Sequence, residues 1–213
     1  MSSLALNPSP VKLICIGRNY GDHARELGNE VPDEPVVFLK PATALLPEGA
    51  DFTFPSFTDE VHYELELVVR ISVAAKDVSQ HAAAQYYDAV SLGVDFTARA
   101  VQASLKAGGL PWEKAKAFDG SAAVGAFVPV GEVGDLDALT FTLDVGGEER
   151  QRGETSHMLF PVDRLVAEAS RYFTLAAGDL LYTGTPAGVG PVHRGDELVG
   201  RLGGRELLRL RVS

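Results

Sequence analysis

Two glutamates, Glu64 and Glu66, stand on either side of Leu65 in a stretch that then becomes almost uniformly apolar. In a β-strand, side chains two residues apart share a face, so the two carboxylates would point the same way. A solvated strand face is one interpretation, but the apolar run that follows is typical of a strand buried on both faces. Burying two adjacent carboxylates is costly because they repel each other and lose their hydration, and a bound cation would offset that cost.

A third carboxylate, Asp95, ends a second apolar stretch at residues 89–95. Three carboxylate donors favour a hard ion, Mg²⁺ or Mn²⁺, over zinc. The sequence thus predicts a metal site made of Glu64, Glu66 and Asp95. His62 falls on the same strand face as the glutamates and could be a fourth ligand. A histidine in such a place is more often a neighbour of the ligands, so it is left out of the predicted set.

His23 and Glu26 are three residues apart in a short stretch of helical character. Residues three apart are neighbours on a helix. A carboxylate that holds an imidazole in one orientation also raises its basicity, which makes the pair a candidate general base near neutral pH. A surface ion pair without catalytic function is the alternative, since His-x-x-Glu alone is a weak signal.

Lys116 and a glycine-rich segment are further candidates. Lys116 lies between aromatic residues in the stretch 112–120, where a lysine could stabilise an oxyanion or, more commonly, extend to solvent. The glycines of residues 183–190 either let the backbone approach a ligand or make a tight turn, and the segment lacks the Gly-Lys-Ser/Thr ending of a P-loop. The chain also has no Gly-x-Ser-x-Gly, no Cys-x-x-Cys and no Cys/His zinc spacing.

Short strands joined by turns must position these side chains, because 22 glycines and 12 prolines are spread through the 213 residues. Apolar and alternating runs predict strands at residues 11–16, 36–39, 63–72, 89–95, 139–145, 148–152, 180–183, 197–202 and 206–212. Helices are expected at residues 23–27, 78–87, 97–106 and 162–173. Strands and helices do not alternate regularly, so the pattern favours a strand-rich α+β fold over a doubly wound parallel sheet.

Acidic residues outnumber basic ones by 29 to 19, which gives a formal net charge of −10. Without a run of Lys or Arg the chain has no basic face for nucleic acid, and its negative charge disfavours anionic membranes. The one cysteine, Cys15, excludes an intrachain disulfide and lies in an apolar run where a buried thiol is expected. The sequence shows no signal peptide and no membrane span. These features together predict a cytoplasmic protein.

The order of the motifs along the chain resembles that of the fumarylacetoacetate hydrolase family. The motifs are Gly17-Arg18-Asn19-Tyr20, His23 with Glu26, Phe38-Leu39-Lys40-Pro41, Glu64-x-Glu66, Asp95-x-Thr97-x-Arg99-x-x-Gln102, Lys116-x-Phe118 and Thr183-Gly184-Thr185-Pro186. The length and the residues before Lys116 are most similar to the single-domain acylpyruvase/oxaloacetate decarboxylase branch. The resemblance implies that residues 1–213 form one catalytic domain, a mixed β-roll with short helices, with a flexible N-terminal segment at residues 1–10.

The resemblance also implies roles for individual residues. Its motifs match Glu64, Glu66 and Asp95 to the family's ligands for Mg²⁺ or Mn²⁺. The other matched positions are the water-activating dyad on a lid, His23 and Glu26, the lysine near the metal, Lys116, and the substrate-binding positions Arg18, Arg99, Gln102 and Thr185. A homodimer and a small 2-oxo acid substrate are implied as well.

The activity that this resemblance implies is metal-dependent hydrolysis of the C–C bond of 3-acylpyruvates, such as fumarylpyruvate or acetylpyruvate, to pyruvate and a carboxylic acid. Alternatives on the same scaffold are oxaloacetate decarboxylation or tautomerisation, and the isomerase and hydratase reactions of aromatic meta-cleavage pathways. The non-enzymatic alternative is a dimeric protein whose carboxylates hold a structural metal ion.

Overall fold

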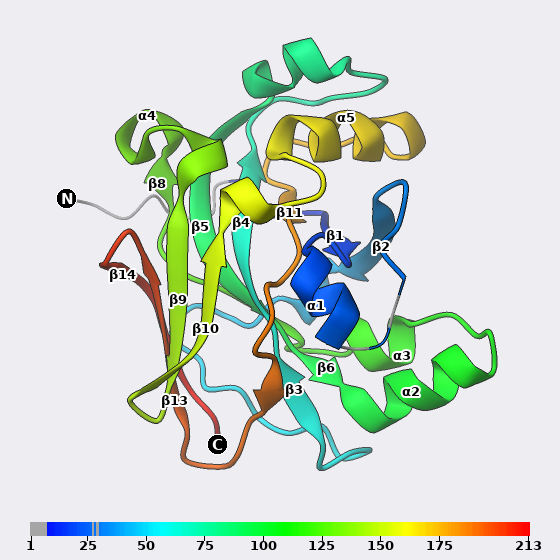
Figure 1. Cartoon of the computed structure of the whole chain (residues 1–213), viewed down its shortest axis with the longest axis vertical. Coiled ribbons are helices and arrows are strands. Elements are labelled where there is room, and N and C mark those ends of the chain that lie inside the picture. The colour runs from blue at the N-terminus through cyan, green and yellow to red at the C-terminus, as the bar shows by residue number, and fades with distance from the viewer. Residues whose placement is uncertain (1–7, 27, 29) are drawn as a thin grey trace.

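The computed structural model describes residues 8–26, 28 and 30–213. A curled seven-stranded sheet forms its centre, with a four-stranded and a three-stranded sheet beside it (Figure 1). The large sheet runs in the order β2-β1-β11-β4-β5-β7, and β8 also pairs with β5. Its strands are β1 (Lys12–Gly17), β2 (Val36–Pro41), β4 (Leu65–Ile71), β5 (Tyr87–Asp95), β7 (Ala122–Val124), β8 (Val128–Pro129) and β11 (Leu180–Tyr182).

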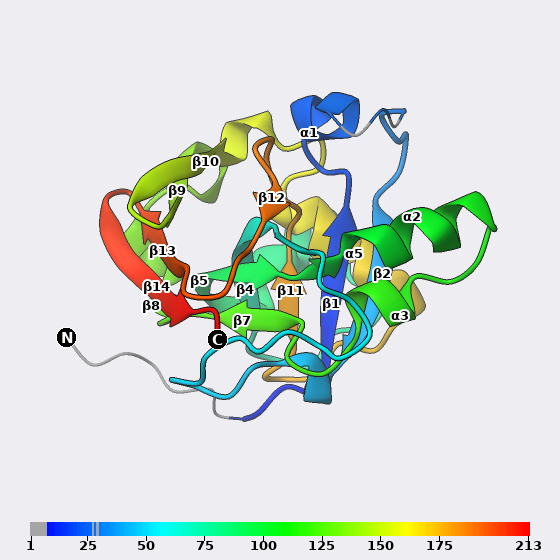
Figure 2. The same ribbon diagram turned by 90° about the horizontal axis from the view of Figure 1, so that it is seen from below.

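The two smaller sheets complete the roll. The four-stranded sheet, in the order β10-β9-β13-β14, forms a curved wall beside β4 and β5 when the molecule is seen from below (Figure 2). Its strands are β9 (Thr140–Val145), β10 (Glu148–Glu154), β13 (Glu197–Leu202) and β14 (Arg205–Arg211). The three-stranded sheet, β12-β3-β6, consists of β3 (Val61–Tyr63), β6 (Thr97–Ala98) and β12 (Gly190–Pro191).

Short helices lie around the sheets (Figure 1). The α-helices of the described residues are α1 (Gly21–Glu26), α2 (Arg99–Ala107), α3 (Glu113–Lys116), α4 (Val130–Val133) and α5 (Val162–Tyr172). The 3₁₀ helices are η1 (Ala42–Ala44), η2 (Gln80–Gln85), η3 (Leu136–Ala138) and η4 (Thr155–His157). Helix α5 packs against η2, whereas α2 and α3 pack against each other at the other end of the molecule.

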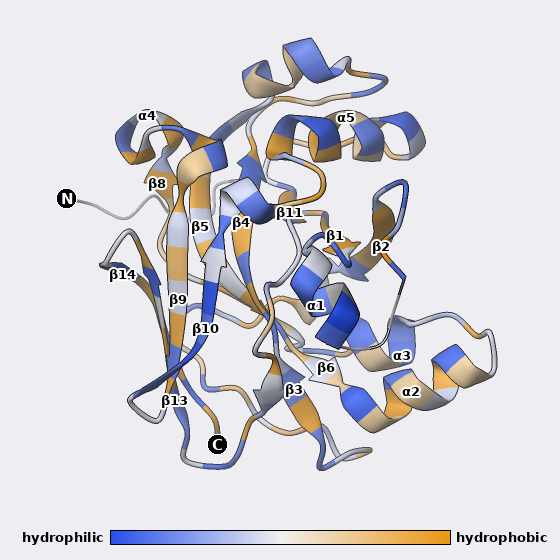
Figure 3. Ribbon diagram, viewed as in Figure 1, coloured by the Kyte–Doolittle hydropathy of each residue, from blue (hydrophilic) through white to orange (hydrophobic). Residues whose placement is uncertain are grey.

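The hydrophobic core is centred on β4, of which all seven residues are buried between the neighbouring strands β11 and β5. Figure 3 shows that β4 is largely apolar, whereas β9 and α5 alternate between apolar and more hydrophilic residues. Gly93 of β5 allows the close packing here, because a Cβ at this position would lie 2.7 Å from the carbonyl oxygen of Ala123 and from a Val68 methyl group. Of the metal-site candidates, Glu66 and Asp95 therefore lie on tightly packed strands, and Glu64 lies between β3 and β4.

The fold class expected from the sequence, a strand-rich mixed α+β roll with short helices, is confirmed. The predicted hairpin joins β9 and β10, and Gly146 and Gly147 at its turn have φ angles of 59° and 85°. Positive φ at both positions is the requirement of a type I′ turn. Cys15 is buried as expected. Among the strand pairs of the described residues, β1 with β11 is parallel and the other strand ladders are antiparallel, so the sheet is not doubly wound.

Three predicted elements are divided differently in the structure. The strand expected at residues 63–72 breaks at Glu64, where the chain passes from the three-stranded sheet to the large sheet and the Leu65 amide donates to the Gln151 side chain. The helix expected at residues 78–87 is present but shorter and of the 3₁₀ type, η2 at residues 80–85, and Tyr87 already belongs to β5. Residues 97–106 begin as the short strand β6 before α2 starts.

Some predictions fall partly outside the described residues. Residues 1–7 of the predicted flexible segment 1–10 and Leu27 of the predicted helix 23–27 lie outside them, while Pro10 is buried. Among the described residues, no helix combines the length and the apolar character that a membrane span requires.

Candidate active site

Three buried carboxylates meet where β3, β4 and β5 come together. Glu64 occupies the break between β3 and β4, Glu66 lies in β4, and Asp95 ends β5. The antiparallel register pairs Leu65 with Val94, and the Asp95 amide donates to the Glu64 carbonyl at 2.9 Å. One oxygen from each of the three carboxylates lies within 4.8 Å of the others. The structure thus brings together the three residues predicted from the sequence.

Two cations bind Glu64. Lys116 Nζ donates to Glu64 Oε2 and to Asp95 Oδ2, both at 2.7 Å. Arg99 donates to Glu64 Oε1 at 2.6 Å and to Gln102 Oε1 at 2.8 Å. Burial opposes ionisation of Glu64, but the nearby charges of Lys116 and Arg99 outweigh it and lower the pKa of this carboxyl. The same carboxylates raise the pKa of Lys116 above its ordinary value, although burial opposes them.

Glu66 differs from Glu64 because its hydrogen bond in the described structure comes from a backbone amide, that of Gly184 at 2.7 Å. Burial and the charge of Asp95 raise the pKa of Glu66 well above its usual range. A buried carboxylate beside another carboxylate is stabilised by a cation. Three buried oxygen donors without a sulfur or imidazole donor fit a hard divalent ion, so these residues suit Mg²⁺ or Mn²⁺.

The imidazole–carboxylate pair predicted from the sequence lies on α1, which stands in front of the large sheet (Figure 1). His23 is buried, and its Nδ1 lies 3.4 Å from Glu26 Oε2. Burial lowers the pKa of His23, while the charges of Glu64 and Glu26 oppose the shift. A lowered pKa keeps the imidazole neutral near pH 7, as a proton acceptor must be.

Two contacts fix α1 in this position. The Gly188 amide donates to both Glu26 carboxylate oxygens at 3.2 Å. At the stem of the helix, the fully buried Asn19 side chain donates to the Thr183 carbonyl at 2.8 Å and accepts from the Phe160 amide at 2.8 Å. The segment that carries His23 is therefore tied to residues distant in the sequence on both sides.

The predicted residues share one cavity, which contains about 450 Å³ of empty space including its open side. Its lining comprises Ile16, Gly17, Arg18, His23, Phe38, Glu64, Glu66, Asp95, Arg99, Gln102, Lys106, Trp112, Lys116 and Thr185. All the sequence-predicted site residues except Glu26 line the cavity, and Glu26 is bonded to His23.

His62 does not lie where the strand pattern predicted. It belongs to β3, and its Nε2 lies 3.5 Å from Glu60 Oε1 rather than beside the three carboxylates. The expectation of one shared face is wrong because the strand breaks at Glu64, and His62 stays outside the carboxylate group.

Two residues to which the sequence reasoning gave no role in the site, Lys40 and Gln151, lie beside the carboxylates or their neighbours. Lys40 is completely buried, donates to the Ser121 carbonyl at 2.8 Å and lies 2.7 Å from Asp95 Oδ1 in an ion pair outside hydrogen-bond geometry. Gln151 of β10 donates to Thr185 Oγ1 at 2.8 Å and accepts from the Leu65 amide at 2.9 Å. A lysine in an otherwise apolar strand was the available signal for Lys40, whereas Gln151 had no local signal.

Comparison with known proteins gives a consistent picture. Residues 12–212 match the family model described as fumarylacetoacetate (FAA) hydrolase, C-terminal. The chain is 44% identical over 201 residues to "oxaloacetate tautomerase FAHD1, mitochondrial" of Bos taurus, covering 94% of this chain and 91% of that protein. It is 42% identical over 205 residues to "oxaloacetate tautomerase YcgM" of Escherichia coli, covering 95% and 94%. A crystal structure of fumarylpyruvate hydrolase from Pseudomonas aeruginosa with Mn²⁺ and pyruvate superposes with a TM-score of 0.90 at 37% identity, covering 99% and 95%.

Proposed function

The chain belongs to the fumarylacetoacetate hydrolase family, and from that premise we propose that it is a metal-dependent oxaloacetate tautomerase. The observation that carries the proposal is a single cavity in which a buried imidazole faces a buried Glu-Glu-Asp group. The curated relatives support this choice of reaction, because two that match nearly the whole chain are named oxaloacetate tautomerase. They favour the alternative drawn from the sequence over its main prediction of an acylpyruvate hydrolase.

Tautomerisation moves one proton and changes no other atom. In the direction from enol to ketone, the C2 hydroxyl loses a proton and C3 gains one, so neither water nor carbon dioxide is consumed or released. The reaction needs a group that transfers a proton at C3 and a positive environment for the oxygen at C2. The cavity offers both kinds of group.

His23 is the proposed proton carrier. As a neutral imidazole it can accept a proton from C3 of the ketone and return it in the reverse direction. Glu26, bonded to Nδ1, would orient the ring so that Nε2 faces the substrate.

The carboxylate group and its neighbours would bind the 2-oxo acid end of the substrate. Glu64, Glu66 and Asp95 would hold Mg²⁺ or Mn²⁺, and the ion, when bound, supplies positive charge that stabilises an enolate. The Lys116 ammonium, already at these carboxylates, would donate to a negatively charged substrate oxygen. Arg99, Gln102 and Thr185 line the same cavity and are proposed to orient the substrate.

Ketonisation of enol-oxaloacetate, followed by its ultraviolet absorbance, tests the proposal directly. We expect an acceleration over the spontaneous rate that requires Mg²⁺ or Mn²⁺ and disappears with EDTA. Pyruvate release from the same samples, measured with a coupled dehydrogenase, separates tautomerisation from decarboxylation. A protein that accelerates neither reaction, nor the hydrolysis of fumarylpyruvate and acetylpyruvate, would be the structural metal protein considered above.

Acylpyruvate hydrolysis is the second candidate because the superposed fumarylpyruvate hydrolase shares the fold at 37% identity. In that reaction His23 would take a proton from water, and the hydroxide would attack the distal carbonyl carbon. The bond between C3 and that carbon would break, leaving pyruvate enolate and a carboxylic acid. Fumarylpyruvate consumption with a kcat/KM above that for enol-oxaloacetate would favour this candidate.

Three expectations from the sequence stay predictions. They are one catalytic domain over residues 1–213, a homodimer and a cytoplasmic location. The location is open in particular because the curated bovine relative is named as mitochondrial.

A further inference from the structure

The cavity holds more positive charge than the proposed metal site uses. Four cationic side chains line it, namely Arg18, Arg99, Lys106 and Lys116, against the three carboxylates of the described lining. Arg99 and Lys116 bind those carboxylates directly. A divalent ion at the same carboxylates would add two more positive charges.

Lys106 belongs to the same face of α2 as the residues beside the metal site. Arg99, Gln102 and Lys106 are spaced i, i+3 and i+7, which places them on one side of a helix. Arg99 reaches Glu64 at the inner end, whereas Lys106 lies in the last turn and is exposed. The helix therefore presents polar groups from the carboxylates outward to the solvent side of the cavity.

Arg18 approaches from the other side, immediately after β1. Its φ of 60° lies in the left-handed region, which is uncommon for a residue other than glycine and typical of functional sites when the surroundings enforce it. The next residue, Asn19, is clamped by the Thr183 carbonyl and the Phe160 amide. The backbone thus holds Arg18 in the wall of the cavity at a conformational cost.

The two cations are close enough to influence each other. Partial burial lowers the pKa of Lys106, and the charges of Arg18 and then Arg99 lower it further. Repulsion between positive groups on facing walls is relieved when an anion lies between them.

We propose that Arg18 and Lys106 bind the second carboxylate of the substrate and make the enzyme selective for dicarboxylic 2-oxo acids over monocarboxylic ones. This inference rests on the proposed function and extends it to substrate selection. The 2-oxo acid end lies at Glu64, Glu66 and Asp95, and the remote carboxylate lies toward the exposed side between β1 and α2. Oxaloacetate has this arrangement of charges, whereas acetylpyruvate has no second carboxylate.

Two stable ligands of equal chain length isolate the contribution of the second carboxylate. Malate and 2-hydroxybutanoate both carry a 2-hydroxy acid end, but malate has a carboxylate where 2-hydroxybutanoate has a methyl group. Their dissociation constants are measured by calorimetry on the Mg²⁺-loaded protein. A charge-assisted contact predicts that the wild-type protein binds malate about tenfold more tightly.

Variants at Lys106 test whether this residue causes the preference for malate over 2-hydroxybutanoate. Lys106→Met is expected to remove most of the preference for malate while leaving the affinity for 2-hydroxybutanoate unchanged, and Lys106→Arg is expected to keep it. Lys114→Met is the matched control, because Lys114 is an exposed lysine near the cavity but not part of its lining. Arg18→Met should weaken malate binding by a similar factor, and its circular dichroism spectrum shows whether the fold is retained.

The outcomes separate this inference from the proposed function. A wild-type protein without preference for malate, or a Lys106→Met variant that keeps the preference, overturns the carboxylate assignment whatever the enzyme's activity. A wild-type protein that prefers malate through Lys106 but does not accelerate ketonisation overturns the tautomerase proposal and leaves the selectivity for dicarboxylates standing.

Discussion

At the scale of single residues, the site depends on how buried charges are compensated. Glu64 has two cationic partners, Asp95 lies between Lys116 and Lys40, and Glu66 has a backbone amide. Glu66 is thus the carboxylate with most to gain from a bound cation. His23 has the opposite character, because burial favours its neutral form. His23, Lys40 and Glu66 should therefore respond differently to substitution.

His23 should control the acid side of the pH profile. Its pKa is lowered from the ordinary value of 6.5, so kcat/KM should stay constant as the pH falls through 6.5 and decline only at lower pH, where the imidazole becomes protonated. Glu26 raises the pKa of His23, so Glu26→Gln should move that decline to still lower pH. His23→Ala should reduce kcat/KM by about 10²–10⁴-fold. A decline that stays in place in Glu26→Gln would contradict the dyad.

Lys40 should matter for metal binding although it does not line the cavity. Lys40→Met removes an ammonium 2.7 Å from Asp95 Oδ1 and frees that carboxylate to rotate. Loss of a supporting contact of this kind weakens metal binding by about 10–100-fold. Calorimetric titration with Mn²⁺ measures the effect, and Lys76→Met, at an exposed lysine, is the control. Unchanged Mn²⁺ affinity in a folded Lys40→Met protein would show that Asp95 needs no such support.

At the scale of elements, the position of α1 decides whether His23 faces the carboxylates. The helix has six residues, too few to be stable alone, so contacts with other segments must hold it. Its stem is fixed by Asn19, and its far end by the bond between Glu26 and the Gly188 amide. The conformation of the loop at Gly188 is therefore part of the catalytic arrangement.

Gly188→Ala should damage activity through this loop. Gly188 has a φ of 94°, and a Cβ there would lie 2.3 Å from the Arg150 carbonyl oxygen, so the loop must shift away from Glu26. Strain of this kind costs about 1–3 kcal/mol, and we expect a lower melting temperature together with a reduced kcat. Gly131→Ala is the matched control, since no atom lies within 4 Å of a Cβ at that helical position. Equal behaviour of the two variants would argue against a role for the loop.

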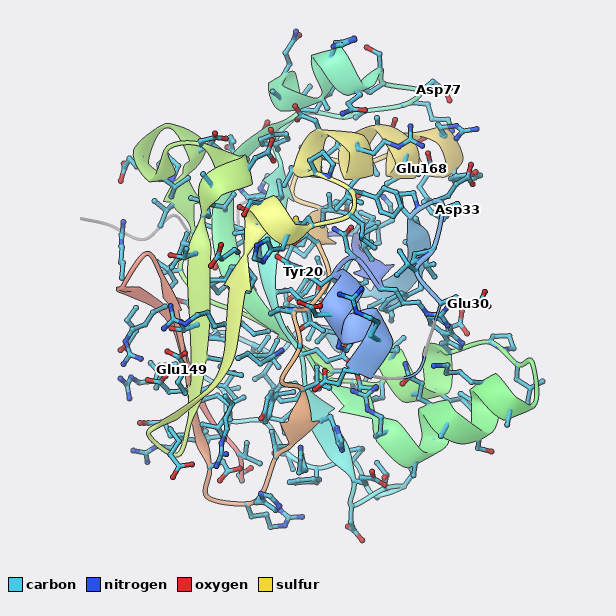
Figure 4. All side chains as sticks on the ribbon, in the orientation of Figure 1. Tyr20, Glu30, Asp33, Asp77, Glu149 and Glu168 are labelled. Atoms are coloured by element: carbon cyan, nitrogen blue, oxygen red, sulfur yellow. The ribbon has the colours of Figure 1, made fainter. Side chains whose placement is uncertain are left out.

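At the scale of the whole molecule, the acidic residues behind the net charge of −10 occupy different environments. Three acids are buried together in the cavity, whereas others project outward at the periphery, as Figure 4 shows for Glu30, Asp33, Asp77 and Glu149. The exposed acids contribute to solubility, and the buried group couples the stability of the fold to a bound cation. Global unfolding should therefore report metal binding.

A bound metal ion should raise the melting temperature, and Glu66→Gln should abolish that increase. At a concentration 100 times the dissociation constant, an ion that binds only the folded chain adds about 2.7 kcal/mol, or about 5–10 °C for a protein of this size. Because burial and Asp95 destabilise the charged form of Glu66, Glu66→Gln should raise the melting temperature in EDTA while abolishing the increase caused by Mn²⁺. An undiminished Mn²⁺ effect in this variant would remove Glu66 from the ligand set.

Residue types and much of the local structure follow from the amino-acid sequence alone. Alternating and apolar runs located most strands, the two glycines at 146–147 marked a hairpin, and carboxylates in apolar strands indicated a cation site. These features can be predicted because the spacing of apolar and polar residues within a short segment indicates the type of element and which of its residues are buried. The resemblance to a known family added the fold type and the roles to be tested.

Contacts between residues that are distant in the sequence depend on the tertiary structure. The break at Glu64 lies where the chain leaves the sheet of β12, β3 and β6 and enters the large sheet, and no local sequence pattern indicates that change. Lys40 of β2 meets Asp95 of β5 although β1, β11 and β4 stand between these strands, so the curl of the sheet brings the two residues together. The packing of α2 opposite β1 brings Lys106 to the same cavity as Arg18. Such contacts depend on strand order and helix position, which arise from packing across the whole chain rather than from any single segment.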